Sequence, residues 1–328
     1  MKCLVAGAGG FIGGHLVDRL MAEGHDVRAV DIKPIGEWWQ SHIASNRPNS
    51  DLRLRDEAFN AVRNMDAVYN LACDMGGIGF IETHKTDCMV SVLINTHLLM
   101  AANYFGVERY FYSSSACVYH ADRQNDPDVT ALCESDAYYN GGAMPEDGYG
   151  WEKLFSERMC RHFSEDYGME TRVARFHNIY GPHGSWNDGR EKAPAALCRK
   201  VAEAECAGKR IVDVWGNGKK TRSFCYIDDC VEGILRLTES DVQEPLNIGS
   251  SELVSVEQLL KTIEGAAGYK VSRDYDLSKP QGVAGRNSDN TLCLEMLDWE
   301  PTTTLADGIA KTYPWIKERV RCKSVQTD

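Results

Sequence analysis

The sequence predicts an α/β fold in which a doubly wound parallel sheet carries a smaller, discontinuous C-terminal domain. Three observations predict it. Strand and helix patterns alternate through the first half of the chain, a glycine-rich turn follows the first strand, and an acidic residue ends the second. Strands that alternate with helices pair in parallel, because each crossover helix returns the chain to the same edge of the sheet.

The elements of the first half follow in order. The apolar segment Lys2–Ala6 is typical of a short buried strand, and Ile12, Leu16 and Leu20 then recur at the spacing of one helix face. Further strands are predicted over residues 28–31, 67–72, 108–119 and 172–176, with a helix over 93–105.

The composition of the chain changes after Phe176, because residues 177–190 are rich in glycine, proline and aromatic residues. We predict a Rossmann-type domain over 1–176 with about 222–245, and a substrate domain over 177–221 and 246–328. In this half, helices are predicted over 191–207, 230–238 and 307–317, a strand over 222–229, a turn over 215–220 and a loop over 280–290.

Size and charge narrow the class of protein. The chain has 328 residues, a net charge of −12 and 12 cysteines. An acidic protein is a poor partner for nucleic acid or anionic membrane, which both need basic surfaces. There is no Cys-x-x-Cys pair, no export signal and no run of about 18 apolar residues. We therefore expect a cytoplasmic protein with reduced cysteines and no membrane span.

The glycine-rich turn predicts a dinucleotide site. Gly7, Gly10 and Gly13 lie between a strand and a helix, with Phe11 and Ile12 opening that helix. Without a Cβ the backbone can approach a pyrophosphate, which the helix N-terminus then binds. Asp31 ends the second strand, where a carboxylate accepts both ribose hydroxyls and repels a 2′-phosphate, so NAD is favoured over NADP. A plain turn is the alternative reading of this motif.

Tyr149 and Lys153 form a Tyr-x-x-x-Lys pair at the start of an amphipathic helix. Residues four apart share a helix face, so we expect the ammonium to lower the pKa of the phenol and make it a usable base. Tyr275/Lys279 and Tyr313/Lys317 match the same spacing, but neither opens a long helix between two strands. Ser115, at the end of a strand, can bind the same substrate oxygen as Tyr149, or can simply cap the strand.

Taken together, these motifs resemble the extended short-chain dehydrogenase/reductase family of nucleotide-sugar enzymes, over nearly the whole chain. Within that family the longest segments are similar to the 3,5-epimerases that act on GDP-mannose. The segments that carry this similarity are residues 70–81, 114–119, 175–200, 221–238 and 285–290.

The resemblance implies a mechanism. Tyr149, helped by Ser115, would take the 4-hydroxyl proton of the sugar as hydride passes to NAD, and the 4-ketone would acidify the hydrogens at C3 and C5. Cys117 and Lys192 would then act as base and acid on opposite faces of the ring. NAD would be held by Gly7, Gly10, Phe11, Ile12, Gly13, Asp31, Asp51, Leu52, Tyr149 and Lys153.

The resemblance also implies the partners. The substrate would be a nucleotide-diphosphate sugar, with no metal site. A homodimer would form through helices over residues 87–105 and 150–164. The substrate contacts would come from Gly76, Ser115, Asn178, Lys192, Lys200, Arg222 and Arg286, of which Arg222 and Arg286 would clamp the diphosphate.

Two alternatives stay open. A 4-epimerase needs no base at carbon, and Cys117 would then be a small buried apolar residue. An NAD-sensing binding protein on the same fold would need none of the proton-transfer groups. Two segments also depart from the resemblance: residues 120–148 are longer than expected, and Lys219 and Lys220 lie near the expected nucleotide site. The nucleobase and the exact sugar are therefore the least determined features.

Overall fold

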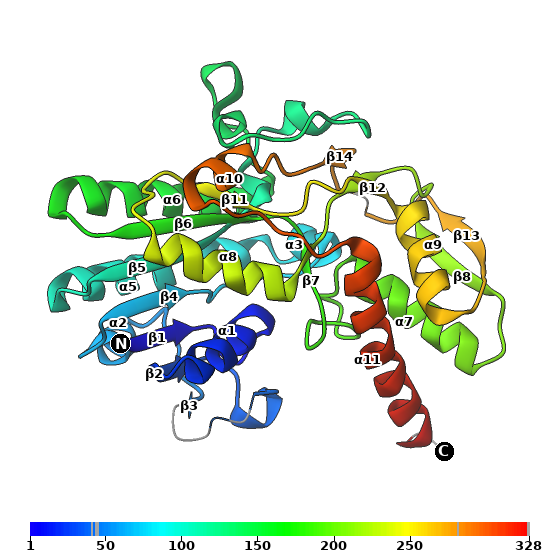
Figure 1. Ribbon diagram of the computed structural model, residues 1–328, viewed down its shortest axis with the longest axis horizontal. Coiled ribbons are helices and arrows are strands. Elements are labelled where there is room, and N and C mark those ends of the chain that lie inside the picture. Colours follow the sequence, from blue (N-terminus) through cyan, green and yellow to red (C-terminus); the bar gives the residue numbers. More distant parts are fainter. Residues whose placement is uncertain (41, 43–45, 281, 327–328) are drawn as a thin grey trace.

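The computed structural model describes residues 1–40, 42, 46–280 and 282–326 and contains a seven-stranded parallel sheet (Figure 1). The strand order is β11-β6-β5-β4-β1-β2-β3, so the winding reverses between β1 and β4. This confirms the predicted doubly wound sheet. Its strands are β1 (Lys2–Ala6), β2 (Asp26–Val30), β3 (Asn46–Arg47), β4 (Ala67–Asn70), β5 (Arg109–Ser115), β6 (Thr171–Phe176) and β11 (Leu246–Ile248).

Both faces of the sheet are buried under helices. In β1, Val5 packs in one apolar core and its neighbour Leu4 in the other, because successive side chains of a strand point to opposite faces. A strand buried on both faces must be apolar throughout, which explains the sequence of β1. The first core contains side chains of α1 (Phe11–Ala22) and α8 (Ile227–Glu239), and the second those of α2 (Arg55–Val62), α5 (Val92–Phe105) and α6 (Asp147–Tyr167).

The C-terminal half adds a second group of elements, at the right of Figure 1. Helices α7 (Ala193–Cys206), α9 (Val256–Ala267) and α11 (Leu305–Gln326) pack on one another, beside the parallel pair β8 (Ile211–Trp215) and β13 (Ser272–Asp276). The remaining short elements are α3 (Ile78–Thr83), α4 (Lys85–Val90), α10 (Thr291–Leu297), β7 (Ile179–Tyr180), β9 (Thr221–Arg222), β10 (Cys225–Tyr226), β12 (Val254–Ser255), β14 (Gly285–Arg286), and the 3-10 turns η1 (Ile35–Glu37), η2 (Ala116–Val118), η3 (Ala121–Gln124) and η4 (Glu134–Gly141).

Some predicted elements differ from the structure. The predicted strand over 222–229 is two short strands, β9 and β10, and α8 already begins at Ile227. The predicted strand over 108–119 ends at Ser115, where the Ser115 hydroxyl accepts the Cys117 N–H and turns the chain into η2. The helices α2 and α9 and the strand β8 were not predicted.

Strand β11 lies beyond the predicted domain boundary near residue 245, yet it pairs with β6 in the large sheet. The sheet therefore continues through Ile248. The division into two domains stays a prediction.

One segment meets the criteria for a membrane span. Residues 85–105 are long and apolar enough by length and composition to cross a membrane. This finding does not test the prediction that the chain has no membrane span. It is weak evidence for a membrane, because a core helix of a globular protein passes the same test, and α5 contributes Leu98 and Leu99 to the second core.

The register of the sheet gathers the predicted motifs at one edge. Ala6 pairs with both Val30 and Asn70, so the residues that follow β1, β2 and β4 meet at their carboxyl ends. Ser115 pairs with Phe176 at the same end of β5 and β6. In open parallel sheets, ligands bind at this edge where the winding reverses.

A long excursion from residue 120 to 146, which we call the arm, leaves the sheet after η2 and returns at the start of α6. It stands clear of the sheet at the top of Figure 1. Its base is joined to β14, because Ala284 N–H donates to the Gln124 carbonyl and Leu132 N–H donates to the Asn287 carbonyl.

Candidate active site

The glycine-rich turn has no room for side chains. Gly7 has a φ of +84°, and a Cβ there would lie 2.8 Å from the Leu71 carbonyl carbon. A Cβ on Gly13 would lie 2.1 Å from the Gly7 carbonyl oxygen, so the helix could not approach the turn. Gly10 is the N-cap of α1 and offers no side-chain cap, which leaves the first N–H groups of the helix for a ligand.

Asp31 completes this site. Its carboxylate accepts the Gly9 N–H at 2.9 Å and the Lys33 N–H at 3.0 Å. Burial raises the pKa of Asp31, although these backbone bonds counteract the shift. A cavity of about 290 Å³ opens beside Gly9, Gly10 and Phe11. A tight turn, an uncapped helix start and a fixed carboxylate suit the pyrophosphate and ribose of a dinucleotide, so the residues fit NAD.

For Asp51 and Leu52, two other predicted cofactor residues, the structure shows contacts within the protein. Asp51 forms an ion pair with Arg53 at 2.7 Å, which lowers the pKa of the carboxyl group. Leu52 is 3% exposed and belongs to the second core. Neither placement tests a contact with the cofactor, and those roles stay predictions.

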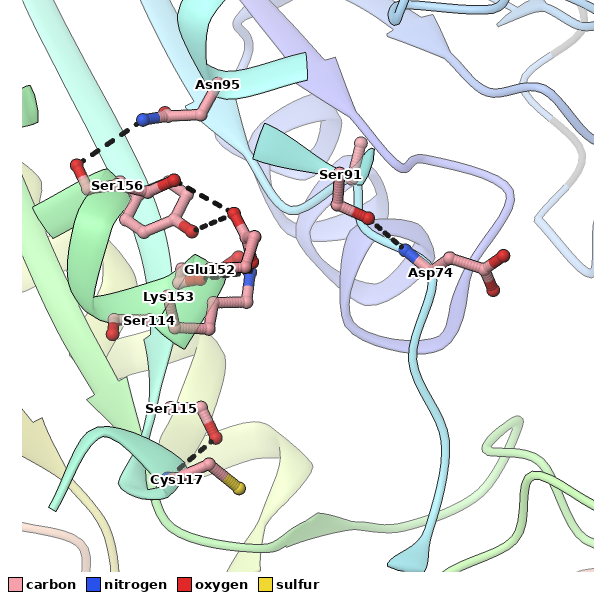
Figure 2. Close-up of polar contacts among 12 residues, drawn as sticks. Asp74, Ser91, Asn95, Ser114, Ser115, Cys117, Glu152, Lys153 and Ser156 are labelled. Carbon is pink, nitrogen blue, oxygen red and sulfur yellow. Dashed lines mark hydrogen bonds and ion pairs between the residues drawn. The ribbon is translucent and has the colours of Figure 1, made fainter. Parts of the chain in front are cut away.

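Tyr149, Lys153 and Ser115 lie together, as the sequence predicted. The Lys153 ammonium is 5.6 Å from the centre of the Tyr149 ring and donates to the Ser113 carbonyl at 2.9 Å. The Ser115 hydroxyl accepts the Cys117 N–H at 3.2 Å and lies close enough to Tyr149 to interact with it. Figure 2 shows Lys153 reaching toward the end of β5, with Ser115 and Cys117 directly below it.

The expected direction of the Tyr149 pKa shift was wrong. Burial raises the pKa of Tyr149 well above its ordinary value, and the nearby thiols Cys73 and Cys117 raise it further, while Ser115 lowers it. Burial would lower the pKa of Lys153, but Cys73 and Glu152 outweigh it and the pKa is raised. In the protein alone the phenol is therefore neutral and the amine is an ammonium ion.

Cys117 is bound by charged groups on two sides. Its sulfur lies 3.5 Å from Nη1 of Arg286, and the Glu146 carboxylate lies nearby. Glu146 in turn pairs with Nη2 of Arg286 at 2.8 Å. Burial raises the pKa of the Cys117 thiol and Glu146 raises it further, whereas Arg286 lowers it. Cys117 is therefore a neutral thiol in this structure.

Lys192 is the N-cap residue of α7. Burial lowers its pKa, and Cys117 is the neighbouring titratable group that opposes this shift most strongly. The two side chains are therefore close enough to interact. No carboxylate pairs with Lys192 in the described part of the chain, so its proton is easily lost.

The loop at Gly76 and Gly77 packs against residues 190 and 191, which directly precede Lys192. A Cβ on Gly76 would lie 2.6 Å from the Phe80 side chain and 3.2 Å from the Arg190 Cα, and Gly77 N–H donates to the Arg190 carbonyl at 2.9 Å. Arg190 also bonds the Asp74 carboxylate at 2.5 Å. The close approach that requires glycine here is to residues 190 and 191, while the predicted contact of Gly76 with substrate stays untested.

The predicted substrate cations differ in their partners. Arg222 donates to the backbone carbonyls of Thr221 and Val283, and burial together with Arg286 lowers its pKa to about 10. Arg286 is buried and Arg222 half-buried, and an anion would relieve the repulsion between the two guanidinium groups. Lys200 instead pairs with Asp213 at 2.6 Å. Asn178 has a positive φ of 47° and donates to the Ser223 carbonyl at 3.0 Å.

Sequence reasoning missed Glu146 and Gln124. Nε of Arg286 donates to Gln124 at 2.6 Å, so both ends of the arm bind the same guanidinium. The position of Glu146, three residues before Tyr149, was the one available signal. Gln124 carried none, because only the folded arm brings it to Arg286.

His177 is a packed, hydrogen-bonded residue and does not belong to a metal site in the described part of the chain. His177 is fully buried and its Nε2 lies 2.9 Å from the Asn247 side-chain oxygen. Among the described residues, no group of three or more His, Cys, Asp or Glu side chains is arranged to hold a metal ion.

Comparison with known proteins finds relatives that are similar to this chain over nearly its full length. The chain is 45% identical to "GDP-mannose 3,5-epimerase 1" of Oryza sativa subsp. indica, over 99% of this chain and 84% of that one. It is 44% identical to "GDP-mannose 3,5-epimerase" of Arabidopsis thaliana, over 98% and 83%. The fold matches UDP-glucose 4-epimerase of Thermotoga maritima with a TM-score of 0.85 at 23% identity, over 98% of this chain and 100% of that one.

The family assignment rests on the part of the chain that builds the large sheet and its site. The model of the NAD dependent epimerase/dehydratase family matches residues 3–249, which span β1 to β11 and include the glycine-rich turn, Asp31 and the Tyr149–Lys153 pair. The chain belongs to the NAD-dependent epimerase/dehydratase family, and NAD is its cofactor.

Proposed function

We propose that this enzyme inverts C3, C5 or both in the sugar of GDP-mannose through a transient 4-keto intermediate. The observation that carries the proposal is that Cys117 interacts electrostatically with both Lys192 and Tyr149, beside Ser115 and Lys153. Simple oxidation and reduction at C4 needs only the last three. The names of the two plant relatives support the choice of GDP-mannose.

The first step needs a proton acceptor at the 4-hydroxyl. Bound NAD supplies the hydride acceptor for that carbon, and a positive charge in its oxidised form. Ser115 lies close enough to the phenol to orient Tyr149 to accept the hydroxyl proton. Lys153, fully buried and bonded to the Ser113 carbonyl, keeps a positive charge near the phenol and stabilises the phenolate that a proton transfer requires.

The second step moves protons at carbon. A ketone at C4 acidifies the neighbouring C–H bonds, because the electron pair left on carbon spreads onto the ketone oxygen. Removing the proton on one face and returning one on the other inverts the centre. A thiol and an amine that lie close enough to interact can perform both transfers, one on each side.

The diphosphate would be bound by Arg222 and Arg286. The burial of both groups strengthens their attraction for an anion, since few water molecules compete. Nη1 of Arg286 directs one N–H to Cys117, and Nη2 directs one to Glu146. The second N–H of each nitrogen remains for a ligand.

Solvent deuterium tests the proposal. Incubated with GDP-mannose in heavy water, the enzyme should incorporate deuterium at C3 or C5, read by NMR or mass spectrometry. Cys117→Ala should reduce this incorporation by about 100-fold or more while binding of NAD and of the sugar nucleotide persists, because a proton-transfer group contributes on that scale.

The control is Cys322→Ala, since Cys322 is exposed on α11 far along the chain. Two outcomes would overturn the proposal. Epimerisation at C4 with no deuterium at carbon would identify a 4-epimerase. NAD retained without turnover of any nucleotide sugar would identify a binding protein.

We propose in addition that the protein forms a homodimer through α4, α5 and α6. Met89, Leu93 and Tyr104 on the first two helices and Phe155 on α6 are between 40% and 74% exposed, although all are apolar or aromatic. Large apolar side chains gathered on neighbouring helices favour a second copy as the partner that buries them. Phe155→Asp should halve the mass measured by light scattering, whereas Leu294→Asp on α10, 48% exposed, should not. An unchanged mass for Phe155→Asp would contradict this interface.

The location and surroundings of the protein are also proposed. We expect a cytoplasmic enzyme that binds neither nucleic acid nor membrane, because its net charge of −12 opposes binding to anionic surfaces. Burial of the apolar face of residues 85–105 by a second subunit would remove that segment from any membrane. Fractionation of cells that express the chain tests the location.

A further inference from the structure

The cavity beside the glycine-rich turn is also lined by the C-terminal helix. Its volume is about 290 Å³, and its lining includes Gly10 and Phe11 at the start of α1 together with Trp315 and Arg319 of α11. The family model ends at residue 249, so α11 lies outside the part of the chain that carries the cofactor motifs. A helix that no cofactor motif includes therefore shares a cavity with the uncapped helix start that suits the diphosphate of NAD.

The guanidinium group of Arg319 is fixed by Trp315. Its central carbon lies 3.7 Å from the centre of the Trp315 ring, and Nη1 donates to the Trp315 carbonyl at 3.2 Å. An arginine that stacks on an aromatic ring keeps its charge and its other N–H donors. Arg319 forms no ion pair with any residue that the structure describes, so those donors can bind an anion.

Trp315 belongs to a group of stacked rings that reaches α1. Its ring centre lies 5.2 Å from that of His183, and His183 stacks on Trp39 at 3.9 Å with 21° between the ring planes. Trp39 lies against α1, because a Cβ on Gly14 would be 2.5 Å from its Nε1 and the His15 ring is 4.6 Å away. These rings therefore fix α11 relative to the helix whose start faces the cavity.

The charges around the cavity single out Arg319. Four other charged residues line it, and all of them are exposed to solvent: Lys33, Glu37, Asp188 and Lys323. Burial lowers the pKa of His183 to about 4, so this ring is neutral near pH 7. The exposed groups are two cations and two carboxylates, which offset each other. Arg319 is half-buried, so water screens its charge less than theirs.

We propose that Arg319 binds the diphosphate of NAD, and that α11 thereby closes the cofactor site. A diphosphate presents negative oxygens that accept hydrogen bonds, and the planar fork of a guanidinium group matches them. This inference goes beyond the proposed function, because it concerns the cofactor and makes no assumption about the sugar. The competing interpretation is that Arg319 only packs on Trp315.

Exchange of bound NAD tests the proposal. The enzyme loaded with NAD is mixed with an excess of isotopically labelled NAD, and the label in the protein-bound cofactor is followed over time by mass spectrometry. In Arg319→Gln the exchange rate should rise about tenfold, because a charge-assisted hydrogen bond to the cofactor is lost. A wild-type exchange rate in this variant would overturn the proposal.

The dependence on salt separates a charge contact from packing. Raising the salt from about 0.1 M to about 1 M shortens the range of electrostatic attraction from about 10 Å to about 3 Å. It should accelerate exchange more in the wild type than in Arg319→Gln, since the variant has already lost one charge contact. Faster exchange with an unchanged salt dependence would show that Arg319 only packs, and would also overturn the proposal.

Arg321→Gln is the matched control, because Arg321 is an exposed arginine of the same helix that does not line the cavity. It should show the wild-type exchange rate and salt dependence. Arg319→Lys keeps the charge without the planar fork, so its rate should lie between those of the wild type and Arg319→Gln. A rate equal to that of Arg319→Gln would contradict a charge contact.

Should Arg319→Gln not fold, Arg319→Met replaces it in every comparison. Methionine still packs on the Trp315 ring through its flexible apolar side chain, but it carries no charge. The same faster exchange and weaker salt dependence are expected, and a wild-type result contradicts the proposal. The measurement needs no nucleotide sugar, so its outcome is independent of the deuterium experiment that tests the proposed function.

Discussion

At the scale of single residues, the site is defined by buried ionisable groups whose neighbours decide which of them carry charge. Lys153 is fully buried yet keeps its proton, because Cys73 and Glu152 outweigh the effect of burial. Lys192, without a carboxylate partner in the described structure, is shifted toward the neutral amine. The two lysines thus differ in the direction of their pKa shifts: the pKa is raised for Lys153 and lowered for Lys192.

Tyr149→Phe tests the first of these arrangements. The variant keeps the ring that packs beside Lys153 but loses the oxygen that accepts the sugar hydroxyl proton. Formation of reduced cofactor on mixing with GDP-mannose should fall by about 100-fold or more, measured by the absorbance of the reduced nicotinamide. Tyr313→Phe, whose tyrosine also begins a Tyr-x-x-x-Lys match but hydrogen-bonds Glu205, should retain the wild-type rate. Undiminished reduction in Tyr149→Phe would remove the phenol from this step.

Much of the site could be predicted at this scale. Tyr149, Lys153 and Ser115 lie together because the strand end and the helix start that carry them are recognisable in the sequence. The direction of the Tyr149 pKa shift could not be predicted, because it depends on how deeply the ring is buried and on Cys73, which comes from the loop after β4. The role of Glu146 could not be predicted for the same reason, because its partner Arg286 is 140 residues away in the chain.

At the scale of elements, the turn from β1 into α1 is the most constrained segment of the protein. Gly13→Ala would place a Cβ 2.1 Å from the Gly7 carbonyl oxygen, and both are backbone positions that cannot move freely. The affinity for NAD should fall at least about tenfold, measured by titration of the protein fluorescence, because the helix start would move away from the turn.

Gly265→Ala in α9 is the matched control, because a Cβ there meets no atom within 4 Å. That variant should bind NAD normally and be more stable by roughly 0.5–1 kcal/mol, since alanine loses less backbone entropy in a helix. Wild-type NAD affinity in Gly13→Ala would show that the turn is not where the cofactor binds.

Element prediction succeeded where one pattern filled a whole segment. β1 and α5 are mostly apolar and were predicted within a residue of their bounds. The segment 222–229 was misjudged because its apolar residues Phe224, Tyr226 and Ile227 suit a strand equally well, while α8 in fact begins at Ile227. Helix α2 has few apolar residues, and only its packing against α5 stabilises it.

At the scale of the whole molecule, buried histidines make the fold sensitive to acid. Burial lowers the pKa of His177 to about 3 and that of His183 to about 4, against an ordinary value of 6.5. Below pH 6.5 the unfolded chain binds protons that the folded protein refuses, so the free energy of unfolding should fall as the pH drops from 6.5 toward 4. His177 alone should contribute up to about 1.4 kcal/mol per pH unit in this range.

Urea unfolding at pH 7 and at pH 5 measures this loss. His177→Gln should flatten the dependence on pH, whereas His162→Gln on the exposed face of α6 should leave it as in the wild type. A stability that stays constant between the two pH values would contradict the assignment of neutral, buried histidines.

The arm is attached at both ends to one guanidinium, through Gln124 where it leaves the sheet and Glu146 where it returns. Within this segment Glu134 bonds Arg175 and Asn247, and Leu132 and Ala137 are buried in a core cluster, whereas residues 138–142 are exposed. Changes in length or sequence are therefore best tolerated at residues 138–142. Enzymes that share this fold could therefore accept different sugars through changes in this one segment, while the catalytic residues stay the same.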